Sequence, residues 1–146
     1  MSVYAGTVVD VLTGAFGIIT IVYGSIYKDD AYCASALVDP SLWLIIAGSV
    51  MLGVSVLDLL HGVYRIQRAD LALVGMRLGL SRLISLILLL SAMFSTAWAT
   101  VGGITLWEDC DSMTPHDLRI FMWIAVIVEC LFALLNLIWL LSIIRI

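Results

Sequence analysis

The sequence predicts an all-α membrane protein: one bundle of four transmembrane helices with both termini in the cytoplasm. Three observations predict this class. Hydrophobic residues make up 63% of the 146 positions and charged residues only 12%, whereas a soluble domain carries roughly 45–50% and about 25%. The apolar residues gather in runs of about 20 or more, the length of a helix that crosses a bilayer. The connections between the runs are short, which favours antiparallel neighbours.

The expected spans cover residues 4–27, 42–64, 83–107 and 120–144 of a single domain, residues 1–146. The first span contains one charged residue, Asp10, and the third contains none. The run LISLILLLSAMF in the third span does not alternate polar with apolar residues as a barrel strand does, which favours helices. No basic segment precedes the first span, so we expect a true span and not a cleaved signal peptide.

The connections differ in charge. The two loops at residues 28–41 and 108–119 carry mostly acidic residues, whereas the connection 65–82 carries one acid against Arg65, Arg68, Arg77 and Arg82. Lys and Arg are retained on the cytoplasmic side during insertion. We therefore expect the basic loop and both termini inside, and the acidic loops outside. The apolar residues of the basic loop also allow it to extend the second helix or to lie on the inner leaflet.

Composition and motifs exclude several classes of function. The chain has 11 acidic and 7 basic residues, the opposite of the basic surface that binds nucleic acid. It contains no HExxH, no Ser/His/Asp set and no Gly-rich phosphate loop. Asp58 and His61 lie one turn apart, but a metal site needs more ligands than these two. We expect a protein that is not an enzyme and that carries no cofactor and no metal.

The cysteines divide by location. Cys33 and Cys110 each fall in one of the two acidic loops, and Cys130 falls inside the fourth span. In an oxidising compartment Cys33 and Cys110 can pair, which predicts a disulfide that ties the first helix hairpin to the second. Two unpaired thiols, or partners on another chain, are the alternatives. Cys130 is expected to be a buried small hydrophobic residue.

Glu129 lies near the middle of the fourth span, deeper than the other ionisable residues. By its spacing of three, four and seven residues it shares one helical face with Ala125, Phe132, Ala133 and Asn136. Ionisable groups at membrane depth cost about 2.5–3.5 kcal/mol on insertion scales and often mark function. This polar stripe must therefore face the bundle interior or a partner.

Three interpretations of Glu129 stay open. It is a proton or cation site, or it is a structural residue that is protonated or hydrogen-bonded, or it pairs with a basic group of another subunit. In the second case its partner is a hydroxyl of the third span, such as Ser95, Thr96 or Thr100.

A second polar cluster is predicted near the inner interface. Asp58 and His61 lie in the inner third of the second span, and Asp10 lies at similar depth in the first. Arg65 or Arg68 is expected within reach of Asp58.

The third span contains a regular pattern of small residues. Ser91, Ser95, Ala99 and Gly103 recur every four residues, a spacing that lets two helix backbones approach closely. Packing within one bundle and docking of another membrane protein both explain the pattern. The second span repeats it more weakly, at Ser49 and Gly53.

The stretch GSIYKDDAYC, followed by DPSLWLIIAGSVML, resembles the first outer loop and second span of the transmembrane-protein-272-like family of small four-span proteins. The matching positions are Gly24, Tyr27, Asp29, Asp30, Cys33 and Pro40. The third span and the loop after it also resemble the family's third span and cysteine-bearing outer loop, at Trp98, Gly102, Trp107 and Cys110. The spacing between Cys33 and Pro40 departs from the family pattern. The resemblance implies a four-helix protein of the plasma membrane or an endomembrane, and it implies no activity.

The short loops and the polar and small-residue faces inside the membrane predict an accessory or scaffolding subunit of a larger membrane complex, such as an ion channel or a transporter. The alternative is a homo-oligomeric ion channel or proton pathway lined by Glu129 and Asn136. A subunit of an organellar complex is a third interpretation. We expect the plasma membrane as the location. The expected partners are membrane lipid and either another membrane protein or further copies of the chain, with no nucleic acid.

Overall fold

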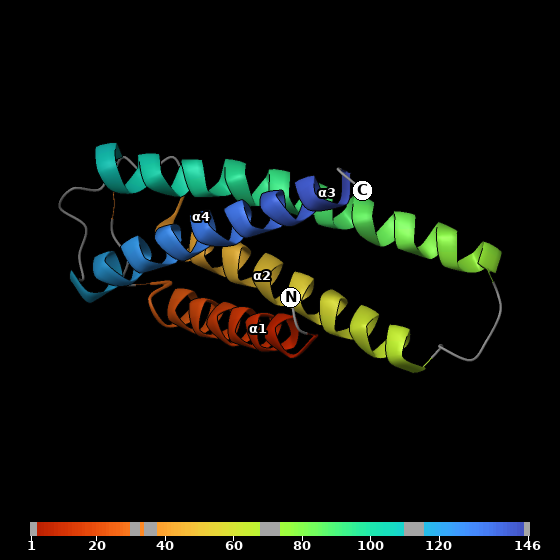
Figure 1. Cartoon of the computed structure of the whole chain (residues 1–146). Helices are drawn as coiled ribbons and strands as arrows, with labels where there is room; N and C mark the ends of the chain where they lie inside the picture. Colours follow the sequence, from red (N-terminus) through yellow and green to blue (C-terminus); the bar gives the residue numbers. More distant parts are fainter. Residues whose placement is uncertain (1–2, 30–32, 34–37, 68–73, 110–115, 145–146) are drawn as a thin grey trace.

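The computed structural model describes residues 3–29, 33, 38–67, 74–109 and 116–144 of the chain. The described residues form the helices α1 (Val3–Ile26), α2 (Pro40–Gln67), α3 (Val74–Ile104) and α4 (His116–Ile144). A π-helical turn, η1 (Thr105–Asp109), directly follows α3. Successive helices run in opposite directions (Figure 1).

The two ends of the bundle differ in charge. We call the end where α1 leads to α2, and α3 to α4, the acidic end, because Asp29, Asp39 and Asp117 are exposed there. The opposite end, where α2 leads to α3, is called the basic end and carries Arg82. Both ends can be followed in Figure 1.

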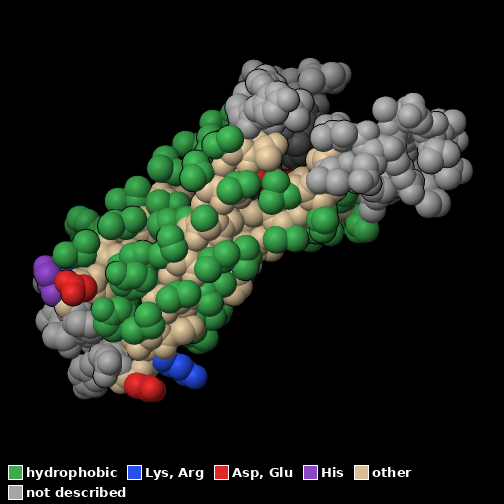
Figure 2. All heavy atoms as spheres, turned by 90° about the horizontal axis from the view of Figure 1, so that it is seen from below, with side chains coloured by type: hydrophobic (Ala, Val, Ile, Leu, Met, Phe, Trp, Pro, Cys, Tyr) green, Lys and Arg blue, Asp and Glu red, His purple; other side chains and the backbone are tan. Residues whose placement is uncertain are grey.

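Each helix contains a stretch long and apolar enough to cross a bilayer: Gly6–Ile26, Pro40–Gly62, Arg82–Trp107 and His116–Ile138. Large aliphatic side chains are exposed on all of these helices, and Figure 2 shows hydrophobic side chains along the length of the described surface. Lipid is the solvent that such a surface requires. The four-helix membrane class predicted from the sequence is therefore confirmed within the described residues.

Glycines bring the backbones of α1 and α2 into contact. A Cβ atom added at Gly48 would lie 2.5 Å from the carbonyl O of Gly17, and one added at Gly17 would lie 2.8 Å from the carbonyl O of Gly48. At Gly24 the nearest atom would be the Ser41 carbonyl O, at 2.7 Å. A side chain at any of these positions would push the helices apart. Close backbone approach of this kind stabilises helix pairs in lipid, where apolar burial supplies little driving force.

α2 begins at Pro40 for a local reason. Pro suits the first helical position because its fixed φ is already helical and its missing N–H would have had no partner there. Asp39 precedes it, and its Oδ1 accepts hydrogen bonds from the backbone N–H (2.8 Å) and the hydroxyl (2.6 Å) of Ser41. The backbone N–H of Trp43 donates to the carbonyl O of Asp39 (2.9 Å). Asp39 therefore caps the helix and sets the register in which Trp43 enters the bundle.

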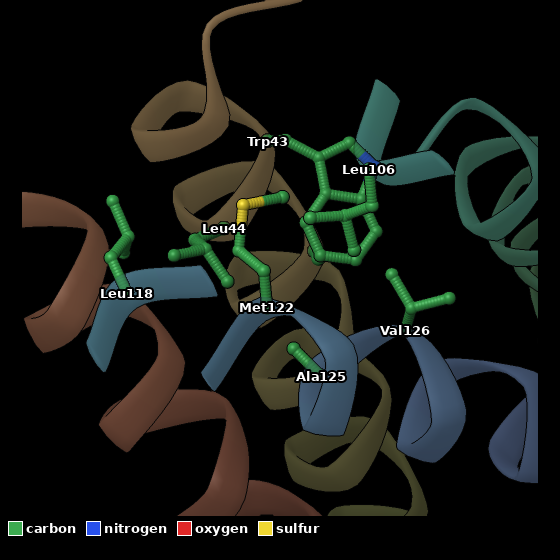
Figure 3. Close-up of a cluster of buried hydrophobic side chains, with 8 residues drawn as sticks. Trp43, Leu44, Leu106, Leu118, Met122, Ala125 and Val126 are labelled. Carbon is green, nitrogen blue, oxygen red and sulfur yellow. The ribbon is translucent and has the colours of Figure 1, made fainter. Parts of the chain in front are cut away.

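The main buried cluster lies near the acidic end, where α2, η1 and α4 meet (Figure 3). It consists of Trp43, Leu44, Ala47, Leu106, Leu118, Met122, Ala125 and Val126. α1 reaches α4 through stacked rings, with centroids 4.0 Å apart for Tyr23–Phe121 and 6.2 Å apart for Phe16–Phe121. Toward the basic end α2 and α3 diverge (Figure 1). The two hairpins are therefore held together mainly at the acidic end.

Helical structure continues farther into the connection 65–82 than predicted. Arg65 lies within α2, which agrees with the interpretation that this connection extends the second helix, and Arg77 and Arg82 lie within α3. The loop is therefore shorter than the predicted 65–82, and Arg68 lies outside the described residues. No proline occurs between positions 41 and 114 to interrupt the helices, and Leu, Met and Arg favour helix. The 31 residues of α3 span about 46 Å, which exceeds the ~30 Å hydrocarbon core.

Gly48→Ala and Gly53→Ala form a matched pair on α2. Both exchanges raise helix propensity by up to about 1 kcal/mol. A Cβ at Gly53 meets nothing within 4 Å, so we expect Gly53→Ala to keep or raise stability. At Gly48 the added Cβ meets the Gly17 carbonyl, and we expect a loss of about 1–3 kcal/mol, the usual effect of overpacking. Unfolding in mixed detergent micelles, followed by circular dichroism, measures both; equal stability would contradict the backbone contact.

Candidate functional site

Two tryptophans connect α2 to α3 by reciprocal hydrogen bonds, and we call them the indole pair. The indole N–H of Trp43 donates to the carbonyl O of Trp98 (2.9 Å), and the indole N–H of Trp98 donates to the carbonyl O of Trp43 (3.2 Å). A Cβ added at Gly102 would lie 2.5 Å from two carbon atoms of the Trp43 ring. The ring of Trp43 therefore occupies the space that a side chain at position 102 would take.

The turn η1 redirects the chain at the end of α3. Thr105 and Leu106 are buried, whereas Trp107 is 76% exposed. A π-helical turn changes the register of the side chains that follow it and is frequent at functional sites. Sequence reasoning missed both this turn and the indole pair. The adjacent glycines Gly102 and Gly103 are the sequence signal for a close approach here.

An open groove lies between α3 and α4 near the acidic end. It has a volume of about 410 Å³ and is lined by Thr100, Gly103, Ile104, Trp107 and Trp123. The rings of Trp107 and Trp123 meet edge to face, with centroids 5.9 Å apart. At Gly103 an added Cβ would find nothing within 4 Å. An occupant of this α3–α4 groove would therefore approach the backbone of α3 directly.

The small residues at every fourth position of α3 do not stay on one face. Ser95 and Ala99 are buried, Ser91 is half-buried, and Gly103 lies at the groove. A step of four residues rotates by about 40° around an α helix, so Gly103 is turned about 120° from Ser91. For Ser95 and Ala99 the burial favours packing inside the bundle. The inward face instead follows steps of three and four residues: Leu88, Ala92, Ser95, Ala99, Gly102 and Leu106.

Glu129 faces the interior of its own bundle and is only 1% exposed. Its carboxyl lies beside the hydroxyl of Ser95 on α3. Neither Glu129 Oε1 nor Ser95 Oγ has a hydrogen-bond partner within bonding geometry. Asn136, two turns farther along α4, donates from Nδ2 to the carbonyl O of Phe132 (3.0 Å). The structure therefore brings Glu129 together with Ser95 and leaves Asn136 bonded within its own helix.

Several hydroxyl groups bond to the backbone of their own helix. Each donates over 2.7–2.9 Å to the carbonyl O four residues earlier, as seen for Thr13, Ser25, Ser49, Thr96 and Thr100. Thr96 and Thr100 are therefore not the partners of Glu129. The inward hydroxyls of Ser55, Ser91 and Ser95 have no hydrogen-bond partner. Ser95 is thus available to the carboxyl beside it.

The polar cluster predicted near the inner interface contains two acids from different helices. Asp10 of α1 and Asp58 of α2 lie close enough for their charges to interact. Both are partly buried, as is His61 one turn farther along α2. The side chains of Arg65 and Arg68 lie outside what the structure describes. Within the described ranges, no group of three or more His, Cys, Asp or Glu could hold a metal ion.

The cysteines lie in different surroundings. Cys33 is half-buried and packs against the main buried cluster, while Cys110 lies outside the described residues. Cys130 is a free thiol on the exposed side of α4, so its predicted burial is wrong. The reason is helical geometry: one residue rotates by about 100°, and its neighbour Glu129 takes the inward position.

The described helices and their exposed aliphatic side chains define an integral, multi-pass helical membrane protein. No protein-family model, no curated protein and no solved structure matches the chain. The resemblance to the transmembrane-protein-272-like family therefore stays a prediction.

Trp43→Phe tests the indole pair. It removes the indole N–H and part of the buried ring, and we expect the free energy of unfolding to fall by about 1–3 kcal/mol. Trp107→Phe is the matched control, because Trp107 is exposed and its exchange should change stability by less than about 0.5 kcal/mol. Detergent unfolding and near-ultraviolet circular dichroism measure both variants. Similar effects at the two positions would argue against the indole pair as a structural link.

Proposed function

We propose that the protein is a non-enzymatic accessory or scaffolding subunit that binds a larger membrane protein, such as an ion channel or a transporter. The observation that carries this proposal is the open α3–α4 groove of about 410 Å³ in the lipid-facing surface. Its proposed occupant is a transmembrane helix of the partner.

The residues of the groove suit a helix. In lipid, helices associate where small residues let their backbones approach and where hydroxyl groups are close. Gly103 supplies an open backbone position, and Thr100 lies one turn away. Trp107 and Trp123 add large aromatic surfaces, which are frequent anchors in protein interfaces.

Charge supports a partner with a basic end. The chain has a net charge of −4, and Asp29, Asp39 and Asp117 are exposed at the acidic end against Lys28 and Arg119. A partner helix with Lys or Arg at the same end would meet complementary charge. Such complementarity favours the correct partner and the correct orientation more than it raises affinity.

A homo-oligomeric channel or proton pathway lined by Glu129 and Asn136 fits this geometry less well. Glu129 faces the interior of its own bundle and offers no carboxyl to a pore between copies. Asn136 already bonds to the backbone of α4. A pore lined by Glu129 would first require α3 and α4 to separate.

We further propose that the basic end faces the cytoplasm and the acidic end the outside, with the plasma membrane as the location. The Arg-rich segment between α2 and α3 supports this orientation, because basic residues are retained inside. Both termini then lie inside, since α1 begins and α4 ends toward the basic end (Figure 1). Membrane lipid surrounds the remaining exposed aliphatic side chains.

Gly103→Leu and Gly53→Leu test the groove. Neither position has an atom within 4 Å of an added Cβ, so we expect both variants to fold with unchanged stability. Leu at position 103 fills the groove, whereas Leu at position 53 lies on the surface of α2. Gentle extraction from native membranes and quantitative mass spectrometry should show at least about a tenfold loss of the partner for Gly103→Leu, which corresponds to about 1.4 kcal/mol. Gly53→Leu should retain it.

The result separates the two functions. Equal recovery of the partner with both variants would contradict docking through the groove. Self-assembly with no other protein bound, together with currents through the purified chain that Glu129→Gln changes, would favour the channel.

We also propose a disulfide between Cys33 and Cys110. Cys33 is not a free thiol, whereas Cys130 is, and Cys110 is the remaining cysteine of the three in the sequence. Such a bond would tie the two hairpins together at the acidic end, next to the main buried cluster.

Cys33→Ser should lower the free energy of unfolding by about 2–4 kcal/mol, because the bond closes a long loop of the unfolded chain. Cys130→Ser, at the free thiol, is the control and should have little effect. Peptide mapping by mass spectrometry without reduction detects the linkage directly. Two free thiols at positions 33 and 110, or a bond to another chain, would overturn the proposal.

A further inference from the structure

Glu129 lies in an apolar interior with no described basic residue near enough to balance a negative charge. On its own helix Arg119 is ten residues away, about 15 Å along the axis. On α3, Arg82 is thirteen residues from Ser95, about 20 Å along the axis. Burial of an ionised carboxylate without a counter-charge is unfavourable by several kcal/mol. A neutral carboxylic acid avoids this penalty.

Ser95 is placed to bond with such an acid. Its hydroxyl is fully buried beside the carboxyl, and neither Ser95 Oγ nor Glu129 Oε1 has another partner. The hydroxyl of the neighbouring Thr96 donates to its own backbone, but that of Ser95 does not. A protonated carboxyl both donates and accepts, and so does a serine hydroxyl. The two groups can therefore satisfy each other across the interface of α3 and α4.

We infer that Glu129 and Ser95 form a proton-binding site, and that the bound proton keeps α3 packed against α4. With the proton in place, both groups are neutral and can bond to each other. When the acid dissociates, the proton passes to water and a carboxylate remains on α4. The hydroxyl of Ser95 can donate one hydrogen bond to that carboxylate, but a buried charge without a counter-charge needs further donors. Water supplies these donors only when α3 and α4 separate.

A cavity shows where this separation would begin. About 90 Å³ of space lies between α3 and α4, lined by Leu89, Ala92, Met93, Thr96, Ala133 and Leu137. Ala133 is one turn from Glu129, and Thr96 is adjacent to Ser95, so the cavity borders the site toward the basic end. Its walls are almost entirely apolar, and an apolar cavity gives water few partners. The closed helices therefore shield the carboxyl, and a wider cavity would expose it.

The other titratable groups of the packed helices lie elsewhere. Asp10 of α1 and Asp58 of α2 interact with each other nearer the basic end, with His61 one turn beyond. Arg82 of α3 lies at the basic end, and Cys130 of α4 faces outward. The first turns of α4 carry three more titratable residues, all at the acidic end: His116, Asp117 and Arg119. Among the described side chains, Ser95 is the one whose hydroxyl interacts with the Glu129 carboxyl.

Isotope-edited infrared spectroscopy tests the bound proton. The chain contains two glutamates, Glu108 and Glu129, so a carbon-13 label in the glutamate carboxyl marks these alone. In lipid vesicles at pH 7 we expect a labelled band of a protonated acid that persists in Glu108→Gln and is absent from Glu129→Gln. Ser95→Ala should keep the band and shift it to higher frequency, because a hydrogen bond is lost. A wild-type spectrum with ionised glutamates alone would overturn the inference without any variant.

The pH dependence of unfolding provides a second measurement. An unfolded glutamate ionises near pH 4.3, about its free value, while the folded site keeps its proton. Above that pH the unfolding equilibrium constant of the wild type should rise by up to about tenfold per pH unit relative to Glu129→Gln, because the folded state binds one proton more. Glu108→Gln should follow the wild type. The same pH dependence in Glu129→Gln as in the wild type would contradict proton binding at this site.

The separation of α3 and α4 is measured with Ala92→Cys in a Cys130→Ser background. Ala92 lines the cavity beside the site. A water-soluble maleimide labels the introduced cysteine. When the pH is raised to alkaline values, we expect its labelling rate to increase at least about tenfold more in this variant than in the same variant with Glu129→Gln added. Equal acceleration in both backgrounds would show that the proton does not hold the helices together.

Discussion

The reciprocal hydrogen bonds of Trp43 and Trp98 are the contact on which the arrangement of the two hairpins depends. Lipid offers no donor or acceptor to a buried indole or carbonyl, so each group must find its partner within the protein. Gly102 leaves the space for the Trp43 ring, and the Asp39 cap sets where that residue enters the bundle. The main buried cluster then forms around the ring of Trp43.

The two hairpins use different means of packing. In the α1–α2 hairpin, glycines place one backbone against the other, and the contact has little room to change. In the α3–α4 hairpin, the interface contains a cavity and a carboxyl oxygen without a hydrogen-bond partner. Packed apolar surfaces and backbone contacts do not respond to protons, whereas an acid in an interface does. Asp10 and Asp58 also interact across α1 and α2, but both are only partly buried, whereas Glu129 is 1% exposed. The α3–α4 interface is therefore where a change of charge would alter the structure most.

The number and approximate position of the helices could be predicted because long apolar runs are a property of the local sequence. The start of α2 also has a local signal, Pro40 after an acidic cap, although the predicted span began two residues later, at position 42. Helix geometry alone predicts that Gly103 is turned by about 120° from Ser91, because the drift of about 40° per step accumulates; the four-residue pattern does not show which of its residues face inward. The indole pair joins residues 43 and 98, and no local signal specifies such a distant partner. Cys130 was misplaced for a related reason: composition indicated burial, but Glu129 holds the inward position.

The groove and the proton-binding site, although proposed on separate observations, share the same two helices. Ser95 lies on the inward face of α3, and Thr100 and Gly103 lie toward the groove. The groove is completed by Trp123 of α4, so it keeps its shape only while α3 and α4 stay together. A partner helix that binds the closed groove would therefore also favour the protonated form of Glu129. Linkage makes this effect reciprocal: if the partner raises the affinity for the proton, the proton raises the affinity for the partner by the same factor.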